Sequence, residues 1–157
     1  MRGGLIQIVD DAMAEAVRRG GVWIACRPGC CECCIGPFAI SQDDARRLRE
    51  GMATLVATDP QRARRLQDRV KAHVESDDAL CPVLDPETGT CDLYDARPIT
   101  CRMFGPAVRA GGDVVGVCEL CYEGATDEEI AACAVDLELP DDADLEETSV
   151  AVALGLE

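Results

Sequence analysis

The sequence predicts a mainly α-helical fold: one small domain over residues 1–157, with an αα-hairpin and irregular loops stabilised by bound metal. Apolar residues recur at helical spacing in several segments, and proline, glycine and cysteine interrupt the segments between them. The chain has only five aromatic residues, so its core must be largely aliphatic. Its eleven cysteines therefore suggest a second source of stability.

The first predicted helix covers residues 5–19, where apolar side chains recur on one face. Gly20 and Gly21 end it. Residues 26–37 then form a loop rich in cysteine, glycine and proline, which is too interrupted for regular structure.

Two consecutive helices follow. The second helix begins at Ser41, where Asp44 completes an acidic variant of the capping box. The third begins at Asp59-Pro60, an N-cap followed by proline at the first helical position, and continues to about Glu75. The short break between the two helices predicts an αα-hairpin.

The second half of the chain is less regular. Residues 79–105 form another cysteine-bearing loop region, and residues 107–118 are expected to form one short β-hairpin. A capping box at Thr126 begins a short helix, and a last helix is predicted over about 141–154. The acidic segment 126–157 is therefore expected to be helical.

The charge of the chain is unevenly distributed. Residues 110–157 carry 14 of the 30 acidic side chains and none of the 15 basic ones. Such a surface repels phosphate backbones and anionic lipid, so neither nucleic acid nor a membrane is an expected partner. A solvated face is the favoured interpretation, and docking of an unidentified protein partner is the alternative.

Cysteine usage depends on the compartment. Acidic residues interrupt any secretory hydrophobic segment at the N-terminus, and no stretch is apolar enough to span a membrane. We therefore expect a cytoplasmic protein, in which clustered cysteines indicate metal or redox chemistry rather than disulfides.

The cysteines fall into three groups and one isolated residue: Cys26, Cys30, Cys31, Cys33 and Cys34; Cys81, Cys91 and Cys101; Cys118 and Cys121; and Cys133. A zinc ion takes about four thiolates at roughly 2.3 Å. Two cysteines separated by two residues can reach one ion, as Cys30 with Cys33 and Cys118 with Cys121 can. Adjacent cysteines diverge, so the role of Cys31 stays open. For Cys133, on the apolar face of a short helix, packing as a small hydrophobe is favoured over ligation.

Four segments resemble the YkgJ-type cysteine-cluster family, whose domain is described as zinc- or iron-chelating. They are Cys30-x2-Cys33-Cys34, Cys81-Pro-Val-Leu-Asp, Gly89-Thr-Cys91-Asp-Leu-Tyr94 and Arg97-Pro98-Ile-Thr-Cys101-Arg102. The resemblance implies that zinc or iron, with an iron–sulfur cluster as one form, is bound by Cys26, Cys30, Cys33, Cys34, Cys81, Cys91 and Cys101. The chain departs from the family in the spacing of Cys26 and in having Cys31, so the pairing of ligands stays open.

Several polar side chains stand beside these cysteines in the sequence. A tetrathiolate zinc site is anionic, so Tyr94, Arg97 and Arg102 are candidates to donate hydrogen bonds or offset charge around the sulfurs. His73, the chain's single histidine, is expected on the buried side of the third helix. A packed histidine is favoured there over a ligand.

These observations predict a metal-binding protein, with an iron–sulfur redox protein as the alternative. An enzyme with a cysteine nucleophile is less favoured, because a base beside the thiol is needed and only one histidine is present. No catalytic residue is assigned.

Overall fold

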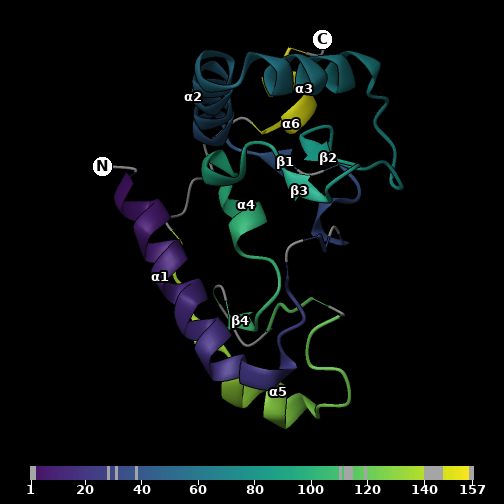
Figure 1. The fold of residues 1–157 in the computed structure, drawn as a ribbon. Helices are drawn as coiled ribbons and strands as arrows, with labels where there is room; N and C mark the ends of the chain where they lie inside the picture. The colour runs from purple at the N-terminus through teal and green to yellow at the C-terminus, as the bar shows by residue number, and fades with distance from the viewer. Residues whose placement is uncertain are drawn as a thin grey trace. The chain divides into compact units, whose positions relative to one another are not determined.

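The computed structural model describes residues 3–27, 29–30, 32–37, 39–109, 111, 115–118, 120–139 and 147–155. The chain divides into two compact units. The first unit comprises residues 1–27 and 102–142, and the second comprises residues 28–101 and 143–157. That residues 1–157 behave as one domain stays a prediction. The mainly helical fold class is confirmed (Figure 1).

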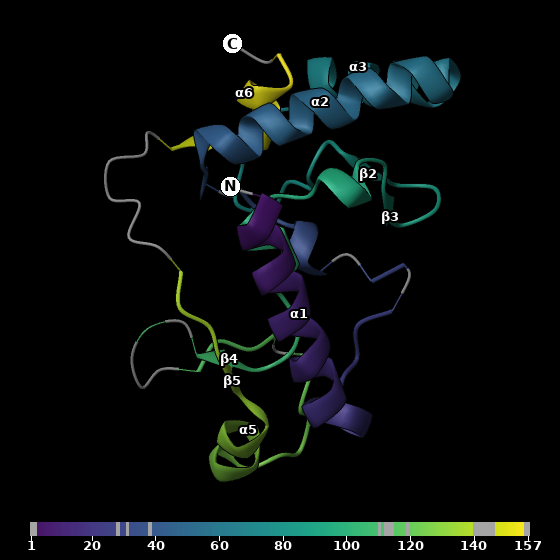
Figure 2. The same ribbon diagram turned by 90° about the vertical axis from the view of Figure 1, so that its left-hand side faces the viewer.

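The second unit is built on the predicted helix pair. Helix α2 (Gln42–Thr58) and helix α3 (Pro60–Ala72) pack against each other, with the short helix α6 (Val150–Ala153) against α2 (Figure 2). Their apolar faces form one core, which includes Ala45, Leu48, Leu55, Ala63, Leu66, Val70, Val150 and Ala153. Aliphatic side chains predominate in this core, as the shortage of aromatic residues predicts.

Local capping explains where these helices begin. The Ser41 side chain accepts from the Asp44 amide, and the Asp44 carboxylate accepts from the Ser41 amide, which completes the predicted capping box. Asp59 caps α3 through the Arg62 amide, and Pro60 occupies the first turn. Both predicted starts are confirmed.

Two short antiparallel strand pairs complete the second unit. Strand β1 (Ala39–Ile40) pairs with β6 (Thr148–Ser149), and β2 (Leu84–Asp85) pairs with β3 (Thr90–Cys91). Two 3₁₀ turns, η2 (Glu32–Cys34) and η3 (Tyr94–Ala96), lie in the same unit, and helix α4 (Ile99–Arg102) begins there. The cysteine-bearing regions are therefore short turns and two-residue strands, close to the irregular loops that the sequence predicts.

The first unit is organised around helix α1 (Gly3–Gly20), which continues into the 3₁₀ turn η1 (Gly21–Trp23). Helix α1 contacts helix α5 (Asp127–Cys133) and strand β5 (Val135–Asp136) (Figure 1). Strand β5 pairs in parallel with β4 (Val108–Arg109). The predicted helix 5–19 and the capping box at Thr126 are confirmed.

The predicted β-hairpin over residues 107–118 is present as an antiparallel bridge between Val108 and Gly116. Two backbone hydrogen bonds, of 3.0 and 2.8 Å, join these residues. The tip of the hairpin at 112–114 lies outside the described residues. Instead of a longer return strand, Val108 takes β5 as a second strand partner.

Two helix ends differ from the prediction. Helix α3 ends at Ala72, so His73 is its C-cap rather than a residue on its buried side, because its backbone is extended there. The last helix was expected over 141–154, but Thr148 and Ser149 form strand β6 and only Val150–Ala153 is helical. Residues 141–146 lie outside the described part of the chain. In the described part, no helix has the length and apolarity needed to cross a membrane.

Candidate metal centre

In the second unit, backbone pairing brings three cysteine-bearing segments together. The Cys81 amide donates to the Cys34 carbonyl at 2.7 Å, and an antiparallel bridge joins Ile35 to Leu80. Cys91 lies opposite Leu84 in the β2–β3 pair, and the Leu84 amide donates to the Cys81 carbonyl at 3.1 Å. Residues 33–34, 81 and 91 are thus held near one another by main-chain contacts alone.

Two buried carboxylates hold the neighbouring backbone in place. Asp92, beside Cys91, is buried and forms ion pairs with Arg62 and Arg69 of helix α3. Asp44 of the capping box accepts from the Ile99 amide at 3.2 Å and so fixes the start of α4, which carries Cys101. The core helices therefore position two of the cysteine-bearing turns.

The electrostatics of the thiols show that five sulfurs share one neighbourhood. The pKa of the Cys34 thiol is raised by its hydrogen bond with Cys33, then by burial, then by the charges of other sulfurs. Burial and the neighbouring sulfurs raise the pKa of Cys91 to about 11 and that of Cys101 to about 12. Cys33, Cys81 and Cys91 are the neighbours that contribute to the raised pKa of Cys34 and of Cys101, so these five residues form one group.

This donor set fits a thiophilic cation. The ten cysteines that the structure describes are thiols rather than disulfides. Burial and mutual repulsion disfavour several thiolates in one place, and a zinc or iron cation among them would reverse that penalty. Among the described residues, no three Cys, His, Asp or Glu side chains already stand in the arrangement of a metal site. The sulfurs are neighbours, and binding would require their side chains to turn toward the ion.

The adjacent pair Cys33 and Cys34 behaves differently from expectation. Neighbouring side chains were expected to diverge, but the two sulfurs are hydrogen-bonded to each other. Both residues lie in the 3₁₀ turn η2. Cys30 is partly buried in the same unit, and Cys31 lies outside the described residues.

The predicted ligands do not all belong to one unit. Cys26, Cys118 and Cys121 belong to the first unit, together with Cys133. The sulfurs of Cys26 and Cys121 lie 3.9 Å apart. Sequence spacing gave no means of assigning Cys26 to the group of Cys118 and Cys121, because only three residues separate it from Cys30.

The basic residues around the sulfurs differ in their surroundings. The charge of Arg97 lowers the pKa of both Cys91 and Cys101, against the larger effects that raise it, and its guanidinium lies 3.7 Å from the Tyr94 ring centroid. Arg102 is buried and donates to both carboxylate oxygens of Asp10, at 3.1 and 2.9 Å. Roles for Tyr94, Arg97 and Arg102 beside a metal stay predictions.

Arg69 was missed by sequence reasoning. Its charge lowers the pKa of Cys81 against the larger effect of burial, and its Nε donates to the Pro82 carbonyl at 2.9 Å. Three-residue spacing from Leu66 places Arg69 on the side of α3 that faces the core. That spacing was the one available signal.

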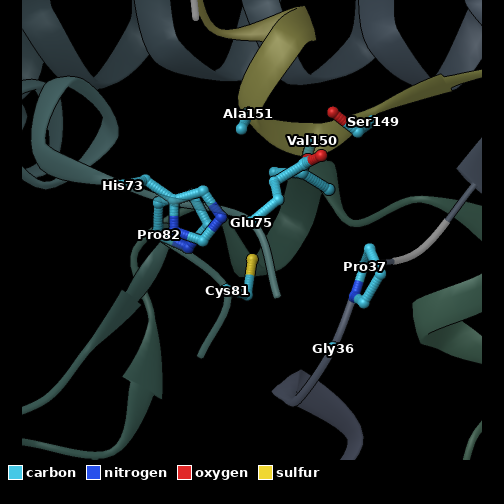
Figure 3. Close-up of a pocket in the computed structure, with 9 residues that line it drawn as sticks. All are labelled: Gly36, Pro37, His73, Glu75, Cys81, Pro82, Ser149, Val150 and Ala151. Atoms are coloured by element: carbon cyan, nitrogen blue, oxygen red, sulfur yellow. The ribbon is translucent and has the colours of Figure 1, made fainter. Parts of the chain in front are cut away.

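A small cavity lies beside Cys81 (Figure 3). Its volume is about 20 Å³, enough for about one water molecule. His73, Glu75 and Pro82 line it, and the Cys81 sulfur points toward the Glu75 side chain. His73 is partly buried here.

Comparison with known proteins gives one match. The family described as "CxxCxxCC: Putative zinc- or iron-chelating domain" matches residues 25–134. No curated protein and no solved structure matches the chain.

Proposed function

The chain belongs to the CxxCxxCC family of zinc- or iron-chelating domains, and on that premise we propose that its second unit binds a zinc or iron ion through thiolates drawn from Cys33, Cys34, Cys81, Cys91 and Cys101. Cys30, which the family resemblance includes, is the further candidate of the same unit. The role is that of a metal-binding protein rather than an enzyme.

One observation carries the proposal: main-chain contacts bring several cysteine-bearing segments together, so that Cys33, Cys81 and Cys91 each contribute to raising the pKa of other thiols in the group, beside the effect of burial. Thiols gathered without a cation destabilise the fold once they ionise, because like charges repel in a partly buried site. A bound dication removes that penalty, and structural zinc contributes about 10–16 kcal/mol of apparent binding free energy in small domains.

An iron–sulfur cluster is the second candidate for the same residues. A [2Fe–2S] or [4Fe–4S] cluster is held by four cysteine thiolates, as a structural zinc ion is, so the group supplies enough sulfurs for either. Anaerobic purification separates the two candidates. Brown protein containing iron and acid-labile sulfide supports the cluster, and colourless protein with stoichiometric zinc supports the single ion.

The proposal is tested by measuring metal per chain in Cys91→Ser and Cys101→Ser. Each substitution removes one sulfur of the group, so we expect each to lose the second unit's metal. Thr100→Ser is the matched control, because Thr100 is partly buried in α4 beside Cys101 and contributes no sulfur. Full metal content in both cysteine variants would contradict the proposal.

A further inference from the structure

We propose that the first unit holds a second metal site of its own, in which Cys26, Cys118, Cys121 and Cys133 bind one tetrahedral, thiophilic dication such as Zn²⁺. This site shares no ligand with the group of residues 30–101. It goes beyond the proposed function, since it would stand even if the second unit bound nothing.

The spacing of the first two sulfurs is that of ligands. Cys26 Sγ and Cys121 Sγ are 3.9 Å apart. Two thiolates at about 2.3 Å from a tetrahedral ion lie about 3.8 Å from each other, whereas a disulfide requires about 2.05 Å. The two sulfurs are therefore too far apart for a disulfide bond, and their separation matches that of two thiolates bound to one ion.

The backbone around Cys118 and Cys121 forms the turn that a C-x-x-C ligand pair needs. The Cys121 amide donates to the Cys118 carbonyl at 3.0 Å, which closes the turn. The Ala25 amide donates to Cys121 Sγ at 3.4 Å. Amide-to-sulfur hydrogen bonds stabilise the thiolate form that binds metal, and this one comes from the residue before Cys26.

Gly105 leaves the space that the Cys26 sulfur occupies. A Cβ at Gly105 would lie 2.4 Å from Cys26 Sγ, and the backbone there has φ +110°, which disfavours any other residue. The Gly105 carbonyl also accepts from the Cys118 amide at 3.0 Å. One residue thus makes room for one proposed ligand and anchors the turn that carries two others.

Tyr122 supplies an independent sign of constraint beside the turn. It has φ 62° and is the non-glycine residue with positive φ in the described part of the chain. Such a conformation costs of order 1 kcal/mol or more and persists where surrounding contacts impose it. Here the Tyr122 amide donates to the Trp23 carbonyl at 2.9 Å, which joins the Cys118–Cys121 turn to the segment leading to Cys26.

Cys133 reaches the same place from helix α5. Cys118 and Cys133 both pack, partly buried, against the core formed by Ala107, Cys121, Tyr122 and Ala134. Packing alone was favoured for Cys133 from the sequence, but the core against which it packs also contains Cys121 and is contacted by Cys118. Because no third side chain already completes a site in the described residues, Cys118 and Cys133 must change rotamer when the ion binds.

The test counts the metal ions bound per chain of residues 1–157. We expect Cys121→Ser and Cys133→Ser each to lose one equivalent of zinc, and Cys101→Ser to lose a different one, so that the double variant Cys101→Ser/Cys133→Ser loses both. The control is Ala132→Ser, an exposed change in the same helix. Cobalt titration reports the geometry, because a tetrahedral cobalt thiolate site has a strong visible spectrum, which Cys133→Ser should weaken.

The two proposals fail in different ways. Wild-type metal content and cobalt spectrum in both Cys121→Ser and Cys133→Ser would overturn the second site. Loss in those two variants, with full content in Cys101→Ser and Cys91→Ser, would overturn the proposed function and leave the second site standing.

A second measurement avoids variants that fail to fold. In the wild-type chain, alkylation followed by mass spectrometry gives the reactivity of each thiol with and without a chelator. We expect chelation to increase the alkylation rate of Cys26, Cys118, Cys121 and Cys133 together by tenfold or more. Unchanged rates at Cys26 and Cys133 would overturn the site.

Discussion

Asp92 carries a larger structural role than its position in a loop suggests. Its carboxylate is almost fully buried, while its partners Arg62 and Arg69 keep 38% and 21% of their side chains exposed. Both arginine side chains are partly exposed, so water can hydrate their guanidinium groups if the carboxylate is removed. The buried partner is therefore the one whose removal leaves the backbone near Cys91 unsupported.

We expect Asp92→Ala to lower the free energy of unfolding by about 2 kcal/mol, because two charge-assisted hydrogen bonds are lost. Urea denaturation measures the change. Asp78→Ala is the control, since Asp78 is exposed and surface substitutions usually change stability by less than about 0.5 kcal/mol. Equal stability of the two variants would show that the ion pairs contribute nothing.

Residue roles could be predicted only in part from the sequence. The cysteines and the basic residues near them stand out by type, so most of the candidates could be found. Their division between the units could not, because it depends on long-range contacts such as the Tyr122 amide to the Trp23 carbonyl. Asp92 and Arg69 also belong to different segments, and nothing local links them.

At the scale of single elements, the helix starts were the most predictable features. A capping box is complete within four residues, and both boxes form as their sequences indicate. Helix ends were less predictable. No glycine or proline marks the end of α3, and the strand pairing of Thr148 and Ser149 with β1 decides where α6 begins.

Loss of the Ser41 cap is expected to fray the first turn of α2. Ser41→Ala removes the acceptor of the Asp44 amide, so we expect a loss of about 1 kcal/mol. Hydrogen exchange should quicken at the Asp44 amide. Ser41→Asn should retain most of the stability, because its side-chain oxygen can take the same role; an equal loss in both variants would exclude capping as the cause.

Gly51 is an interior helical glycine, but its replacement by alanine is expected to destabilise the fold instead of stabilising it. Replacing an interior helical glycine by alanine gains about 1 kcal/mol in propensity. In α2, however, a Cβ at Gly51 would lie 2.6 Å from the Ala96 Cβ of η3. We therefore expect Gly51→Ala to destabilise the second unit by about 1–3 kcal/mol through overpacking. Thermal denaturation measures the change in stability. A stabilised Gly51→Ala variant would show that η3 moves away from the added methyl group at little energetic cost.

At the scale of the whole molecule, the two units combine stable helices with turns that contain little hydrogen-bonded structure. Helices α2 and α3 share an aliphatic core, against which Cys81 and Cys91 pack. Most of the sulfurs stand in two-residue strands, single turns or irregular segments, with Cys101 in the four-residue helix α4 and Cys133 at the end of α5. Bound metal should therefore matter most in those segments.

Metal removal is expected to increase local opening of the backbone more in some segments than in others. After chelation, we expect hydrogen exchange to increase most in peptides covering residues 81–101 and 115–126, and least in the centre of α2. Hydrogen-exchange mass spectrometry with and without chelator measures this. Equal increases throughout would mean that the helical core itself depends on the ion.

The path of the chain between the units has a consequence for synthesis. The polypeptide leaves the first unit after residue 27, completes most of the second, returns at residue 102 and enters the second again near its end. During translation, β1 (Ala39–Ile40) emerges long before its partner β6 (Thr148–Ser149) and stays unpaired until β6 has been synthesised. Neither unit is a contiguous segment, so a partly synthesised chain contains incomplete parts of both units. The cysteine thiols that are translated first therefore stay exposed to oxidants and chaperones until the segment containing β6 has been synthesised.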